Sequence, residues 1–226
     1  MNWVRRRVNM SEQMRSTNAS PRVYRMTRRA EQVDLTRQQI TAATARLHTT
    51  IGPANTSIAA IAQEAGVTRL TVYRHFPEMD ELFAACRAHW RSENLPPDAR
   101  AWATIDAFES RARHALIELY GWYRAKAEAL FPIYRDVTTM PLSSQQAVRK
   151  DIEYLAAAIG AGDVPDDPAG MRLRAAIRHL VDFRTWRSFA IDQELDDAEI
   201  VEVAVGMLEH GSPSGCGSSS LGAAGI

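Results

Sequence analysis

Several features that define common protein classes are missing from this sequence of 226 residues. It contains only two cysteines, Cys86 and Cys216, which excludes a disulfide framework, and their spacing does not suit metal ligands. No stretch approaches the roughly 20 consecutive apolar residues of a membrane span, and the N-terminus lacks the apolar run of a signal peptide. We therefore expect a cytoplasmic protein with no membrane partner.

Motifs of common catalytic and metal sites are also absent. The six histidines never recur at an i, i+4 spacing, and no Glu-x-x-His pair occurs. There is no phosphate-binding glycine loop, no dinucleotide fingerprint and no Gly-x-Ser-x-Gly elbow. We therefore predict no catalytic residues, no metal site and no cofactor, and an all-α enzyme remains only as an alternative.

The composition predicts a globular protein, because 46% of the residues are apolar and 24% are charged. Its net charge of zero conceals an asymmetry. Residues 1–91 hold 14 arginines against 7 acidic residues, whereas residues 92–226 hold 11 arginines and 2 lysines against 20 acidic residues. A basic front half is typical of a protein that binds nucleic-acid phosphates, although a solvated basic arm would give the same count.

The first third of the chain predicts a disordered basic arm, residues 1–33, and then three helices. Apolar residues spaced as on one helix face run from 35 to 51, where Gly52 and Pro53 end the helix. Thr56 or Ser57 can cap a second, short helix that ends at Gly66.

Thr68 can cap the third helix, which Pro77 ends. Val72 and Phe76 lie four residues apart and are expected in the core. The residues expected to point outward are Arg69, Leu70, Thr71, Tyr73 and Arg74. Two short helices joined by a tight turn, with the second exposing arginine, threonine and tyrosine, have the form of a helix-turn-helix DNA reader.

The rest of the chain shows only helical patterns, so the predicted class is all-α with about nine helices. Ser143 or Ser144 is expected to cap one of them. Asp167 with Pro168 opens a helix that runs to about Ile191, and Asp196 with Glu199 forms a capping box for the last helix. The predicted parts are an arm (1–33), a three-helix helix-turn-helix head (34–82), a C-terminal helical bundle for effector binding and dimerisation (83–210) and a disordered tail (211–226).

The last helix has a broad apolar surface, which predicts that it is covered on two sides. A second copy of the chain would cover one of them, giving a homodimer, whereas burial within one bundle is the alternative. The predicted interface residues are Trp186, Ile200, Val203, Ala204, Met207 and Leu208.

Residues 57–82 read SIAAIAQEAGVTRLTVYRHFPEMDEL. This run resembles the N-terminal DNA-binding domain of the TetR family of bacterial transcriptional regulators, and residues 181–189 and 195–208 resemble the family's paired C-terminal helices. The resemblance implies a homodimeric repressor or regulator that binds double-stranded DNA at a palindromic operator and holds a small-molecule effector in its C-terminal domain. An activator, or a constitutive binder without effector, stays as an alternative.

By position, the resemblance assigns Arg69, Leu70 and Thr71 to base contacts and Tyr73 and His75 to phosphate contacts. Met79 stands where members commonly have lysine, so affinity is expected to lean on other arginines and on the arm. The full predicted DNA-binding set is Arg37, Thr56, Ser57, Thr68, Arg69, Leu70, Thr71, Tyr73, Arg74 and His75.

Aromatic residues of the central helices would either form ordinary core or line a pocket for a largely apolar effector. The predicted effector-binding residues are Trp102, Phe108, His114, Tyr120, Tyr123, Tyr134 and Phe183.

Overall fold

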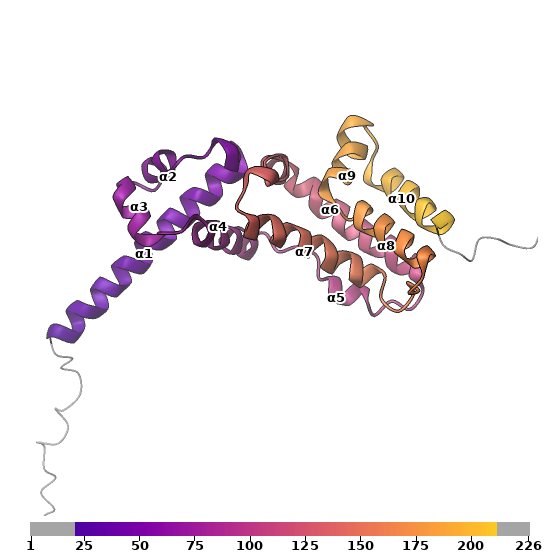
Figure 1. The fold of residues 1–226 in the computed structure, drawn as a ribbon, viewed down its shortest axis with the longest axis horizontal. Helices are drawn as coiled ribbons and strands as arrows, with labels where there is room; N and C mark the ends of the chain where they lie inside the picture. Colours follow the sequence, from indigo (N-terminus) through magenta and orange to yellow (C-terminus); the bar gives the residue numbers. More distant parts are fainter. Residues whose placement is uncertain (1–20, 212–226) are drawn as a thin grey trace, which may run out of the picture. The chain divides into compact units, whose positions relative to one another are not determined.

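A computed structural model describes the backbone of residues 21–211 and the side-chain burial of residues 28–209. Within this range the fold is all-α, as predicted, with ten α-helices rather than nine and no strand (Figure 1). The helices are α1 (Pro21–Thr50), α2 (Ile58–Glu64), α3 (Arg69–His75), α4 (Met79–Glu93), α5 (Ala99–Trp102), α6 (Phe108–Arg135), α7 (Leu142–Ile159), α8 (Pro168–Leu180), α9 (Phe183–Arg187) and α10 (Asp197–Gly211). Three single turns are η1 (Pro53–Asn55), η2 (Val137–Thr139) and η3 (Ser188–Asp192).

The chain divides into two units, residues 1–39 and 40–226. In the first unit the helix already begins at Pro21, so the part of the predicted disordered arm from 21 to 33 is helical instead. Proline suits the first position of a helix, and no glycine or further proline follows until Gly52. The rest of the predicted arm, residues 1–20, and the predicted tail from 212 onward lie outside the described residues.

In the second unit, the helix-turn-helix head consists of α2, α3 and the parts of α1 and α4 that pack on them. Its core is small and contains one aromatic ring: Ile40, Ile61, Ala62, Val72, Phe76 and Leu82. The prediction that Val72 and Phe76 are buried is confirmed, since their exposed fractions are 0% and 1%.

Helix α4 belongs to both of the predicted domains. Leu82 packs in the head core, whereas Trp90, two turns later, packs against the core of the bundle. The predicted boundary between residues 82 and 83 therefore falls inside one continuous helix, because neither glycine nor proline interrupts Met79–Glu93.

The bundle consists of α5 to α10, with α6 in contact with α5, α7, α9 and α10. Figure 1 shows α6, α7 and α8 side by side. The core is rich in aromatic rings, and the hydroxyls of Tyr120 and Tyr123 donate to the carbonyls of Leu180 (2.9 Å) and Val181 (2.7 Å) at the end of α8. These bonds satisfy carbonyls that a helix end leaves without partners.

The predicted helix from Pro168 to about Ile191 is broken, because Asp182 starts a new helix by accepting a hydrogen bond from the Arg184 N–H (2.8 Å).

Of the side-chain caps predicted for α7 and α10, the structure contains one and lacks the other. Asp196 and Glu199 form the expected capping box with two bonds of 2.9 Å, whereas α7 begins after Pro141 with no side-chain cap from either serine.

Candidate functional site

The turn between α2 and α3 is fixed by local contacts. Ser57 Oγ accepts from the Ala60 N–H, and Thr68 Oγ1 accepts from the Thr71 N–H, each at 3.1 Å, so both helices have side-chain N-caps. Gly66 has φ +67°, in the left-handed region that favours glycine, and ends α2. This geometry packs one face of α3 into the core of the head and leaves its other face exposed to solvent.

The outward face of α3 is exposed and basic. Leu70 is 77% exposed and Tyr73 is 52% exposed, and Arg69 and Arg74 are also exposed. Within the described part of the chain neither arginine has an ion-pair partner, so both guanidiniums can meet phosphates or base edges. Thr71 and His75 are half-buried beside this face.

The remaining predicted DNA-binding residues have different surroundings. Arg37 is half-buried and lies in the first unit. The hydroxyl of Thr56 donates to the Gly52 carbonyl at 2.8 Å, while Ser57 and Thr68 serve as caps. Arg46 of α1 pairs with Glu64 of α2 at 2.9 Å.

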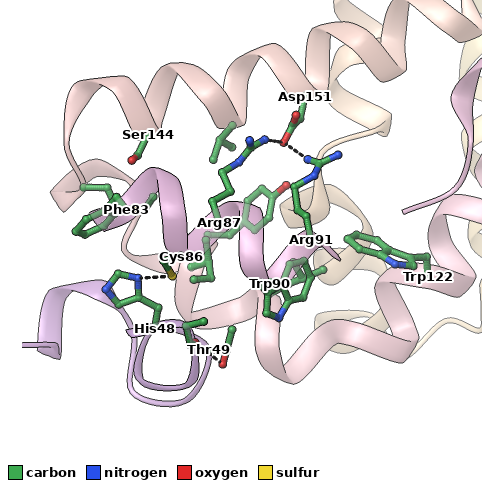
Figure 2. Close-up of a pocket in the computed structure, with 16 residues that line it drawn as sticks. His48, Thr49, Phe83, Cys86, Arg87, Trp90, Arg91, Trp122, Ser144 and Asp151 are labelled. Carbon is green, nitrogen blue, oxygen red and sulfur yellow. Dashed lines mark hydrogen bonds and ion pairs between the residues drawn. The ribbon is translucent and has the colours of Figure 1, made fainter. Parts of the chain in front are cut away.

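A cavity of about 120 Å³ lies between α1, α4, α6 and α7. Its wall is mainly apolar and aromatic, and Figure 2 shows a polar cluster at one side of it. The apolar lining is formed by Phe83, Trp90, Trp122, Leu130, Ile133, Tyr134, Met140 and Val148.

Of the seven predicted effector-binding residues, Tyr134 alone lines this cavity. Four of the others are buried core residues with exposed fractions of at most 2%: Trp102, Tyr120, Tyr123 and Phe183. Phe108 packs half-buried against the same core, and His114 is exposed beside Glu118. The predicted set did not include Phe83, Trp90 and Met140, because a helical stripe does not reveal which of its members border a void.

Two polar groups meet at one end of the cavity, where the Cys86 sulfur lies 3.6 Å from His48 Nδ1 (Figure 2). Burial lowers the pKa of His48 to about 4, although the nearby Asp136 carboxylate acts in the opposite direction. Burial also raises the pKa of the Cys86 thiol to about 12. At neutral pH both groups are therefore uncharged, and the thiol is unreactive.

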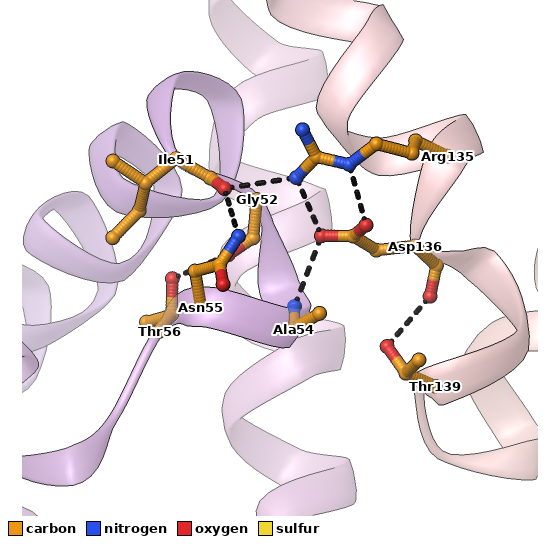
Figure 3. A network of polar contacts seen from close by, with 8 residues as sticks. All are labelled: Ile51, Gly52, Ala54, Asn55, Thr56, Arg135, Asp136 and Thr139. Carbon is orange, nitrogen blue, oxygen red and sulfur yellow. Dashed lines mark hydrogen bonds and ion pairs between the residues drawn. The ribbon is translucent and has the colours of Figure 1, made fainter.

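A polar network joins the end of α6 to the segment that leads into α2 (Figure 3). Asp136 accepts from the Ala54 N–H at 3.1 Å, and Arg135 donates to the Ile51 carbonyl at 2.9 Å and to the Asp136 carboxylate. The hydrogen bond from Arg135 is the main reason that the pKa of Asp136 is lowered. Gly52 has φ +92°, and a Cβ there would collide with both side chains.

The predicted dimer residues divide into two groups. Trp186, Ile200, Ala204 and Leu208 are buried in the core of their own chain. Val203 and Met207 are 38% and 50% exposed, so they are the two members of the set that a partner could contact. The apolar pattern of α10 is thus explained largely by its contacts with α6 and α8.

Among residues 28–209, whose side chains the structure describes, no group of histidine, cysteine, aspartate and glutamate is arranged to hold a metal ion. Among the same described residues, none of the helices is long and apolar enough to cross a membrane.

Comparison with known proteins places residues 40–86 in a family. Residues 40–86, which span the head, match the family model described as bacterial regulatory proteins, tetR family. No curated protein matches the chain. Regulators of the TetR family are non-enzymatic DNA-binding proteins. Residues 40–86 are thus a TetR-family domain, and the chain that carries it is a DNA-binding transcriptional regulator.

Proposed function

We propose that this regulator is a cytoplasmic homodimeric repressor that a small, largely apolar effector releases from a palindromic operator. The observation that carries the proposal is the double role of α4. Leu82 belongs to the head core, and Cys86, Arg87, Trp90 and Arg91 line the cavity. A molecule that enters the cavity must contact a helix that is also part of the DNA-binding head, so its binding free energy can shift the position of the head.

The exposed face of α3 supports sequence reading. Arg69, Leu70 and Thr71 lie at its beginning, which is the part of a recognition helix that meets base edges. An arginine can bind guanine with two hydrogen bonds, and a leucine can contact the thymine methyl group. Tyr73 and His75 would then donate to phosphates.

Exposed apolar side chains on α10 support the dimer. Val203 and Met207 lie one helical turn apart on the surface. Two copies joined there would present two α3 helices to successive major grooves, about 34 Å apart. Met207→Arg should convert the dimer to monomers in sedimentation measurements, and an unchanged mass would remove this interface from the proposal.

The test of the main proposal begins with selection of DNA fragments from a random duplex pool. We expect a palindromic consensus whose affinity falls as salt rises. Tyr73→Ala should weaken binding to all sequences, whereas Arg69→Ala should also relax base preference at one position. Tyr154→Ala is the matched control, because Tyr154 is a similarly exposed tyrosine (51%) on α7.

Recovery of no enriched sequence by the folded protein would overturn sequence-specific binding. Small molecules are then screened for their effect on the selected operator complex. Release of DNA supports a repressor of this type, tighter binding would indicate an activator or a co-repressed regulator, and no effect of any cavity ligand would leave a constitutive binder.

A further inference from the structure

The wall of the cavity carries more positive than negative charge. Arg87 and Arg91 lie four residues apart on α4, and both donate to the same oxygen of Asp151 on α7, Arg91 at 2.8 Å (Figure 2). His48 adds no charge at neutral pH, because it is buried with a pKa of about 4. Among the described residues that line the cavity, two guanidiniums therefore share one carboxylate.

This arrangement leaves guanidinium N–H groups available for a second anion. The three side chains are between 36% and 39% exposed, so they stand where the cavity opens to solvent rather than sealed inside it. A planar carboxylate fits the fork of an arginine with two parallel hydrogen bonds, which are stronger than bonds between neutral groups.

Besides the two arginines, the wall contains an indole N–H group with no hydrogen-bond acceptor among the described residues. Trp122 lines the cavity, and its Nε1–H is buried with no hydrogen-bond acceptor among the residues that the structure describes. A buried donor left in this state is unfavourable, because it has lost its hydrogen bond to water without gaining another. An acceptor atom on a bound molecule would remove that cost. Trp122 also packs edge-on against Trp90, with ring centroids 6.0 Å apart.

We propose that the effector is a monoanionic aromatic acid whose ring occupies the apolar part of the cavity and whose carboxylate pairs with Arg87 and Arg91. The inference rests on the proposed function, which places an effector in this cavity. The volume of about 120 Å³ sets the scale at one ring, since an apolar cavity of about 150 Å³ accommodates benzene. The aromatic lining supplies faces and edges for ring packing.

The experiment compares matched ligands on the full chain by calorimetry. The probes are benzoate and 2-naphthoate, their neutral amides, and the cations in which a CH₂–NH₃⁺ group replaces the carboxylate. Since the ligands differ mainly in the charged group, differences within a set report on the charge of the wall. We expect the better-fitting carboxylate to bind about tenfold more tightly than its amide, and the cations to bind least.

Variants of the polar cluster give effects of opposite sign. Arg91→Gln removes the excess charge and should weaken carboxylate binding about tenfold, whereas Asp151→Asn frees both arginines and should strengthen it about threefold or more. Amide binding should change little in either variant. Glu153→Gln is the matched control, because Glu153 is an exposed carboxylate on the same helix that does not line this cavity. Circular dichroism checks that each variant is folded.

The outcomes separate this inference from the proposed function. The anionic class is overturned if neither carboxylate outperforms its amide, including the case in which no probe binds, or if Asp151→Asn and Arg91→Gln weaken binding alike. Carboxylates that bind with the expected charge dependence but leave operator affinity unchanged would support the ligand class and contradict effector control. Amides that release DNA when carboxylates do not would support effector control and overturn the ligand class.

Discussion

The helix-turn-helix head and the bundle solve the problem of burial in different ways. The head has a small, almost entirely aliphatic core, and it satisfies its helix ends with nearby hydroxyls such as those of Ser57 and Thr68. The bundle buries large polar side chains and satisfies them with partners far away in the sequence, as Tyr120 and Tyr123 do with carbonyls of residues 180 and 181. Because local contacts hold the ends of its helices, the head can leave one face of α3 free for binding. The stability of the bundle depends instead on long-range contacts.

The largest loss of stability that we predict from this contrast concerns Arg111 in the bundle. Its side chain is 3% exposed and donates to four backbone carbonyls and to the Asp163 carboxylate. Arg111→Met should lower the free energy of unfolding by about 3–5 kcal/mol, because several buried acceptors lose their donor. Arg113→Met, two residues away, should cost much less in urea titrations, because the ion pair of Arg113 with Glu202 is screened by solvent. Equal costs would contradict the role assigned to Arg111.

His48, at the border of the head and the cavity, predicts a dependence of stability on pH. Its folded pKa of about 4 lies below the ordinary value of 6.5, so the unfolded chain binds the proton first as pH falls. The stabilisation is complete above pH 6.5 and is lost progressively down to pH 4, by roughly 3 kcal/mol. His48→Gln should make the free energy of unfolding depend less on pH between pH 6.5 and pH 4. An unchanged dependence on pH would show that another group is responsible.

Gly52 tests the network that joins the bundle to the head. Alanine there would adopt an unfavourable φ of +92°, and its Cβ would displace Arg135 and Asp136. We expect Gly52→Ala to cost about 2 kcal/mol or more. Gly66→Ala is the matched control, since φ is +67° there but no atom lies within 4 Å of the added Cβ, so the cost should be about 1 kcal/mol. A larger loss at Gly66 would mean that the network contributes little.

The smallest expected effect belongs to the head. Thr68→Ala removes the N-cap of α3 and should lower stability by about 1 kcal/mol, whereas Thr68→Ser keeps the hydroxyl and should be nearly neutral. Chemical denaturation of the two variants checks this. If serine failed to rescue the loss, the methyl group of Thr68 rather than its hydroxyl would matter.

The two functional regions were not equally predictable. The outward face of α3 and the caps at Ser57 and Thr68 follow from spacing within about 20 residues, and the structure places these side chains accordingly. The cavity did not follow from such spacing: Tyr134 lines it, but Tyr120 and Tyr123 are core. A stripe of aromatic residues has the same period whether the opposing surface fills it or leaves a void.

The sequence by itself determined the all-α class, the helix-turn-helix head and the family to which residues 40–86 belong, because periodicity, caps and turn glycines act between close neighbours in the chain. The tertiary structure decided where the cavity lies, which charges surround it, and that Ile200 and Ala204 face their own core. Those properties depend on contacts between residues that are separated by tens of positions. Arg87 and Asp151, for example, meet only because α4 and α7 pack together.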